Sequence, residues 1–126
     1  MMTARLCLLT GALFGFLSVA LGAFAAHGLK NIFDDYSMGI FRTGVEYQFY
    51  HAIALLACAA ITLKVESTQI RIAAFAFLLG IVVFSGSLYL LAFTKLKLWG
   101  AVTPIGGVSF LVGWVFLFIA GLKLGD

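Results

Sequence analysis

The residues best suited to chemistry stand close together in the middle of the chain. Glu46, Tyr47, Tyr50 and His51 fall within an otherwise apolar stretch. If this stretch is a helix, Tyr47, Tyr50 and His51 share one face, and so do Glu46 and Tyr50, because steps of three and four residues align. Histidine titrates near neutral pH, so His51 and Glu46 could share a proton or hold a small ligand.

More polar residues interrupt apolar runs further along the chain. Together with the first four they form what we call the candidate polar cluster: Glu46, Tyr47, Tyr50, His51, Ser85, Ser87, Tyr89 and Thr103. One interpretation is a water-accessible pocket inside a membrane protein. The other is a hydrogen-bonded plug that ties the second helix to the first loop and the third helix. We prefer the structural interpretation, and both remain open on the sequence.

The composition indicates that lipid, rather than water, surrounds these residues. The chain has 126 residues, of which 63% are hydrophobic and 10% charged, against roughly 45–50% and 25% in soluble proteins. We therefore expect an all-α integral membrane four-helix bundle, forming a single transmembrane domain over residues 1–126. The net charge of +3 is scattered, so nucleic acid is not an expected partner.

Four apolar runs are long enough to cross a bilayer as helices. We place the spans at residues 6–26, 47–63, 72–93 and 102–122, with Thr103 capping the last helix and Pro104 at its first position. Residues 34–46 are expected to form a separate short helix in the interface, along which Arg42 and Glu46 can pair. The first run also has features of a signal peptide, although it is longer than the usual signal core.

Four crossings place both termini and the turn near residues 64–71 on one side of the membrane, side A. The long first loop and the turn at residues 94–100 then lie on side B, the side on which the candidate polar cluster gathers. The positive charges are tied at four on each side, and we expect side A, with both termini, in the cytoplasm.

No pattern for a cofactor or a metal is visible. Cys7 and Cys58 each stand alone in an apolar run, with no ligand spacing. No nucleophile and base stand in a recognisable arrangement, so we do not expect an enzyme. Spaced small residues such as Gly11 and Gly15 indicate close helix contact, within one chain or between copies.

Four motifs in order resemble a known family. They are GAFAAHGL from Gly22, FRTGVEYQFYHAIALL from Phe41, FSGSLYLL from Phe84, and TPIGG from Thr103 with the later Gly113-Trp114. These stretches resemble the YgdD-like family of small bacterial inner-membrane proteins, a domain of unknown function with a small eukaryotic transmembrane relative. The resemblance implies a multi-span inner-membrane protein and brings no reaction, cofactor or catalytic residue.

Two functions follow as hypotheses. The first is a non-enzymatic structural, accessory or partner-binding membrane protein that contacts lipid and a second copy or another membrane protein. The second is a minimal oligomeric transporter or channel that moves a small molecule or ion through the candidate polar cluster.

Overall fold

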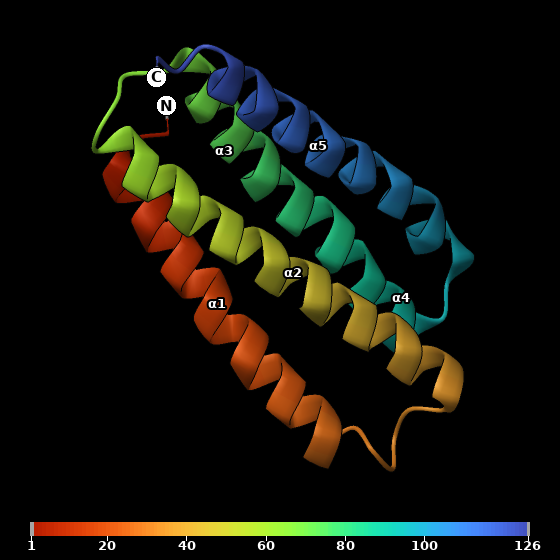
Figure 1. The fold of residues 1–126 in the computed structure, drawn as a ribbon. Helices are drawn as coiled ribbons and strands as arrows, with labels where there is room; N and C mark the ends of the chain where they lie inside the picture. Colours follow the sequence, from red (N-terminus) through yellow and green to blue (C-terminus); the bar gives the residue numbers. More distant parts are fainter. Residues whose placement is uncertain (1, 126) are drawn as a thin grey trace.

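A computed structural model describes residues 2–125, and all the regular structure in them is helical. The helices are α1 (Ala4–His27), α2 (Asp35–Thr62), α3 (Thr68–Gly80), a π-helical turn η1 (Ile81–Ser85), α4 (Gly86–Thr94) and α5 (Lys97–Leu122). Because α3, η1 and α4 follow one another without a break, they form one rod, Thr68–Thr94 (Figure 1). The expected all-α fold is confirmed.

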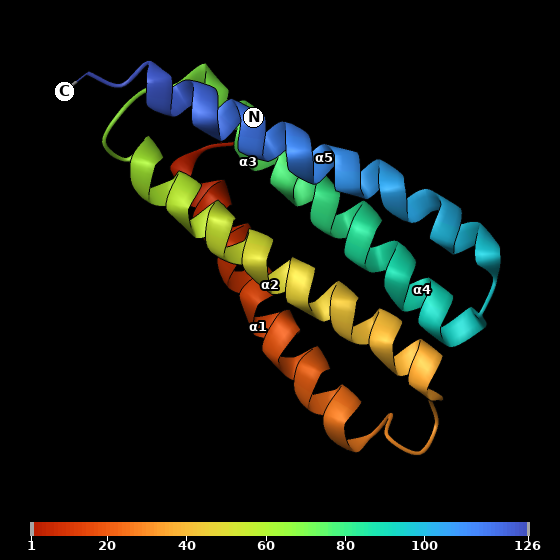
Figure 2. The ribbon, with the colours of Figure 1, turned by 45° about the vertical axis from the view of Figure 1, so that its right-hand side comes forward.

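The helices thus make four rods: α1, α2, Thr68–Thr94 and α5. Each of them is long and apolar enough to cross a membrane. Each of the four spans predicted from the sequence falls on one of them, apart from Leu63, which follows the end of α2. The rods run side by side, with α1 and α5 outermost (Figures 1 and 2). α1 packs mainly on α2, while α5 packs on α3, η1 and α4, so α2 and the long third rod form the centre.

The prediction of a separate interfacial helix over residues 34–46 is wrong. These residues form the N-cap and first half of α2, which continues unbroken to Thr62. The side chain of Asp34 accepts a hydrogen bond from the backbone N–H of Ser37 at 2.8 Å and so caps the helix. No proline follows this cap within the segment, so nothing ends the helix before the apolar run begins. The polar first half stays helical outside the hydrocarbon because its backbone groups are hydrogen-bonded within the helix.

The start of the last helix also differs from the prediction. Because α5 begins at Lys97, Pro104 lies inside the helix and Thr103 is not its cap. Thr103 Oγ1 instead donates a hydrogen bond to the carbonyl of Trp99 at 3.1 Å. The threonine next to a proline therefore gave a first helical position seven residues too late, at Pro104 instead of Lys97, because the first turns of α5 resemble a loop in composition.

The π-helical turn η1 lies where α5 approaches closely. A Cβ atom on Gly106 would lie 2.3 Å from the backbone nitrogen of Phe84 and 2.6 Å from its Cα. Only glycine allows backbones this close. π-Helical turns are short insertions that the spacing of apolar residues does not reveal, and the sequence alone did not indicate this one.

Candidate functional site

His51 lies in the interior with both ring nitrogens hydrogen-bonded. Its Nδ1 is 2.7 Å from the carbonyl oxygen of Tyr47, and the indole N–H of Trp114 donates to its Nε2 at 3.0 Å. A carbonyl oxygen only accepts, so Nδ1 carries the hydrogen and Nε2 offers its lone pair. This geometry fits the neutral imidazole.

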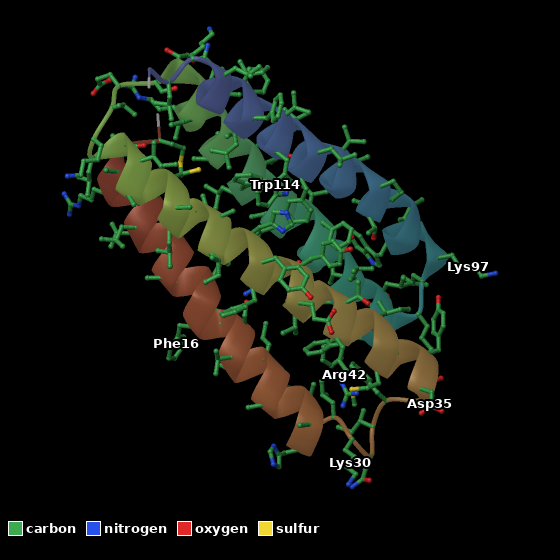
Figure 3. The ribbon with its side chains drawn as sticks, in the orientation of Figure 1. Phe16, Lys30, Asp35, Arg42, Lys97 and Trp114 are labelled. Carbon is green, nitrogen blue, oxygen red and sulfur yellow. The ribbon has the colours of Figure 1, made fainter. Side chains whose placement is uncertain are left out.

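An aromatic cluster surrounds this histidine. The His51 ring stacks on Phe110, with ring centres 3.6 Å apart and planes 9° apart. Phe77 packs edge-on against Trp114 at 4.9 Å. Figure 3 labels Trp114 on α5, whose side chain points into the space between α5 and α2. The histidine and the aromatic rings therefore join α2, α3 and α5.

Gln48, which the candidate polar cluster does not include, links three helices. Its Oε1 accepts a hydrogen bond from the Tyr89 hydroxyl of α4 at 2.6 Å, and its Nε2 donates to the carbonyl of Phe14 in α1 at 3.0 Å. Gln48 is only 3% exposed. The signal that could have found it is the stripe Phe41, Gly44, Gln48, Leu55, because these apolar and small residues mark the buried face of α2.

The two serines and the threonine of the cluster form two further links. Ser85 donates to the carbonyl of Gly44 at 2.7 Å and so joins η1 to α2. The hydroxyls of Ser87 and Thr103 lie 2.5 Å apart and join α4 to α5. With the links made by Gln48 and His51, every rod is hydrogen-bonded to a neighbour through a side chain.

The other three members of the cluster are exposed, but only Glu46 and Tyr50 face outward, because the Tyr47 ring packs against Phe84 with ring centres 4.9 Å apart. Glu46 and Tyr47 are exposed, and Tyr50 is 53% exposed. Glu46 and Tyr50 border an apolar groove of about 240 Å³ that is also lined by Ser18, Val19, Val45 and Phe49. Among residues 2–125 the ion pair expected between Arg42 and Glu46 is not formed. The structure thus divides the eight residues between the interior and an outer face of α2.

On side B, an ion pair joins the two loops. The ammonium of Lys95 lies 2.7 Å from a carboxylate oxygen of Asp34, so the first loop and the α4–α5 turn are at the same end of the molecule, as predicted. Hydrogen bonds from Lys95 and from the Ser37 N–H lower the pKa of the Asp34 carboxyl from 3.8 to about 2. Both partners are half exposed, so the pair orients the loops more than it stabilises them.

The part of the chain that the structure describes holds no group of three or more His, Cys, Asp or Glu side chains that could bind a metal ion. Cys7 and Cys58 are both buried and unpaired with each other. They pack in the main apolar core with Leu55 and Phe77.

The fold and these contacts define a helical membrane protein with four membrane-length rods that are tied together by internal hydrogen bonds. The profile of a family described as "Protein of unknown function (DUF423)" matches residues 21–107, and the chain belongs to this family. The resemblance to the YgdD-like proteins is confirmed as well, because a YgdD protein matches almost the whole chain. The chain is a membrane protein, and its relatives have no stated biochemical role.

The relatives match along almost their whole length. The "UPF0382 inner membrane protein YgdD" of Escherichia coli (strain K12) is 44% identical over 123 residues, which are 98% of this chain and 94% of the relative. The "UPF0382 membrane protein YwdK" of Bacillus subtilis (strain 168) is 38% identical over 120 residues, covering 94% and 98%. No solved structure matches the chain.

Proposed function

We propose that this chain is a non-enzymatic subunit of the inner membrane that presents a fixed outer face to a membrane partner. One observation carries the proposal. The buried polar side chains other than Ser37 are hydrogen-bonded within the molecule, as in the His51–Trp114 and Gln48–Tyr89 contacts, whereas the polar side chains facing outward, Glu46 and Tyr50, lack such partners among residues 2–125.

The internal pairing supports a structural role for His51. A general base needs a free lone pair within reach of a reacting proton. The Nε2 lone pair of His51 is occupied by Trp114, and its Nδ1–H is held by a carbonyl group. Proton transfer would require the aromatic cluster to open.

A minimal oligomeric transporter or channel is the second candidate, and the exposed carboxylate of Glu46 favours it. Ionisable residues at membrane depth often mark an ion or substrate path. Such a path would run along the outside of α2 and would need other copies or a partner to enclose it, because the groove beside Glu46 is open and almost wholly apolar.

A flux measurement separates the two candidates. The full-length protein is reconstituted in liposomes, and the movement of protons, Na⁺ and K⁺ is compared with that in empty liposomes. We expect no flux above background for the wild type, and a lower melting temperature for His51→Ala. Flux that is present in the wild type and vanishes with His51→Ala or Glu46→Gln would overturn the proposal in favour of transport.

The proposed orientation has both termini in the cytoplasm. It can be tested with Ser67→Cys, which lies in the turn between α2 and α3 on side A, because the native Cys7 and Cys58 are buried. An impermeant thiol reagent should label this variant only after intact cells are opened. Labelling in intact cells would place side A outside.

A further inference from the structure

α2 carries a stripe of exposed residues along its whole length, although it is a central helix. We call this the α2 stripe; its members are Tyr36, Gly39, Arg42, Glu46, Tyr50, Ile53, Ala57 and Ala60. Their spacing of three or four residues keeps them on one side of the helix. The outermost helices differ, since they expose mainly apolar side chains such as Phe16, which points away from α2 in Figure 3, and Phe118.

The charges in this stripe lie close to the expected hydrocarbon boundary. A helix of 28 residues is about 42 Å long, roughly 12 Å more than the hydrocarbon core. If Thr62 marks the boundary on side A, Arg42 lies at the headgroups of side B, and Glu46, one turn further on, lies a few ångströms inside. Charged residues at such depth are normally paired or shielded from lipid. Among residues 2–125, however, the ion pairs are Arg71–Glu66 and Lys95–Asp34.

We propose that a second copy of this chain packs against the α2 stripe around a two-fold axis along the membrane normal, with Arg42 of each copy paired to Glu46 of the other. The inference rests on the proposed partner-binding role and names the partner. A two-fold axis along the normal keeps equivalent residues at equal depth, and an interface of this kind uses the same surface on both copies.

The geometry of the stripe suits this arrangement. Residues four apart on a helix are about 6 Å apart along its axis, which is within the reach of an arginine side chain. Each copy supplies one positive and one negative charge, so two copies neutralise both without a third component. Ala57 and Ala60 at one end, and Gly39 at the other, leave room for two backbones to approach closely.

The experiment uses charge reversal to separate pairing between copies from pairing within one helix. Two full-length copies with different affinity tags are expressed together, and the recovery of one with the other is measured after extraction in mild detergent. The combinations are wild type with wild type, Arg42→Glu with itself, Glu46→Arg with itself, and Arg42→Glu with Glu46→Arg. Energy transfer between labelled copies in lipid vesicles gives a second readout.

We expect each reversed variant to associate with itself at least tenfold less than the wild type, because its stripe carries like charges only. The mixed combination should recover to within about twofold of the wild type. The like-charge repulsion within each variant's own helix is the same whether the variant is expressed alone or in the mixture. Recovery of association in the mixture therefore reports contact between copies. Lys97→Glu, an exposed charge on side B outside the stripe, is the matched control and should leave association unchanged.

Two results would overturn the inference: a wild type that stays monomeric in vesicles, or a mixed combination that associates no better than the reversed variants alone. Circular dichroism and a single elution peak must show that each variant is folded. If the copies do not associate and no flux is measured, a second copy is excluded as the partner and the non-enzymatic proposal stands. If flux is measured in the liposome assay, the non-enzymatic proposal is overturned even if the dimer forms.

Discussion

The close approach of α5 to η1 leads to a sharp prediction, because two adjacent glycines differ in what surrounds them. A Cβ on Gly106 would lie 2.3 Å from the backbone nitrogen of Phe84, while a Cβ on Gly107 would lie no closer than 3.8 Å to the Phe84 ring. Ordinary contacts between heavy atoms begin near 3.5 Å. Gly106→Ala must therefore push two helical backbones apart by about 1 Å, whereas Gly107→Ala fits without movement.

The expected magnitudes follow from this difference. Overpacking typically costs about 1–3 kcal/mol, and the upper end applies at Gly106 because the obstructing atoms are backbone. Alanine is also about 1 kcal/mol better than glycine within a helix. We therefore expect Gly106→Ala to lower the free energy of unfolding by about 2 kcal/mol, roughly a thirtyfold change in the unfolding equilibrium. Gly107→Ala should be neutral or should stabilise the protein by up to about 1 kcal/mol.

The assay is equilibrium unfolding in mixed micelles of a mild and a denaturing detergent, followed by circular dichroism. Both variants change one glycine to alanine in the same helix turn, so their effects on the unfolded chain are matched. If Gly106→Ala proves as stable as Gly107→Ala, the helices do not approach at Gly106 as the structure places them.

Three further predictions concern the hydrogen bonds and the ion pair. Gln48→Leu keeps the shape but removes two interhelical hydrogen bonds, and it should lower the free energy of unfolding by about 1–2 kcal/mol in the same assay. Nitrogen NMR shifts of His51 should show the Nδ1–H tautomer, and Trp114→Phe should alter the shift of Nε2; an Nε2–H tautomer would contradict the assigned contacts. The pKa of Asp34 is about 2 when folded against 3.8 normally, so its stabilising contribution is complete above about pH 4 and is lost as the pH falls toward 2. In Lys95→Met this acid-induced decrease in melting temperature should shrink, and an unchanged decrease would show that the ion pair does not cause it.

The parts of the fold that follow from composition were predictable. Long apolar runs define the four rods, and the even number of crossings places the first loop and the α4–α5 turn together, where Asp34 and Lys95 meet. Hydrophobicity alone did not show that residues 34–46 and the span at 47–63 form one helix, nor where α5 begins, because the first turns of both helices project beyond the apolar runs. The helix start predicted at residue 34 agrees with the Asp34 cap, since an aspartate that accepts from the N–H three residues later commonly starts a helix.

Within the candidate site, spacing predicted which residues share a face but not which face a neighbouring helix covers. Tyr47, Tyr50 and His51 were grouped correctly along α2, yet His51 is 4% exposed and Tyr50 is 53% exposed. The difference arises because Trp114 of α5 and Phe110 cover only one edge of that face. Such coverage depends on how separate helices pack, which a pattern along one helix does not contain.

Glu46 and Gln48 show what this packing means for function. The two residues are neighbours on α2 and differ by little in size, but two residues along a helix turn the side chain by about 200°. Gln48 consequently lies inside and joins α1 to α4 through neutral hydrogen bonds, while Glu46 lies outside with its carboxylate exposed. A neutral amide can satisfy both of its groups within one chain, but a carboxylate at the edge of the hydrocarbon needs an opposite charge. We therefore expect the inward polar residues to determine the stability of the single chain, and the outward ones to determine what it binds. Glu46→Gln should leave unfolding in detergent almost unchanged while weakening association between copies, and the reverse pattern should hold for Gln48→Leu.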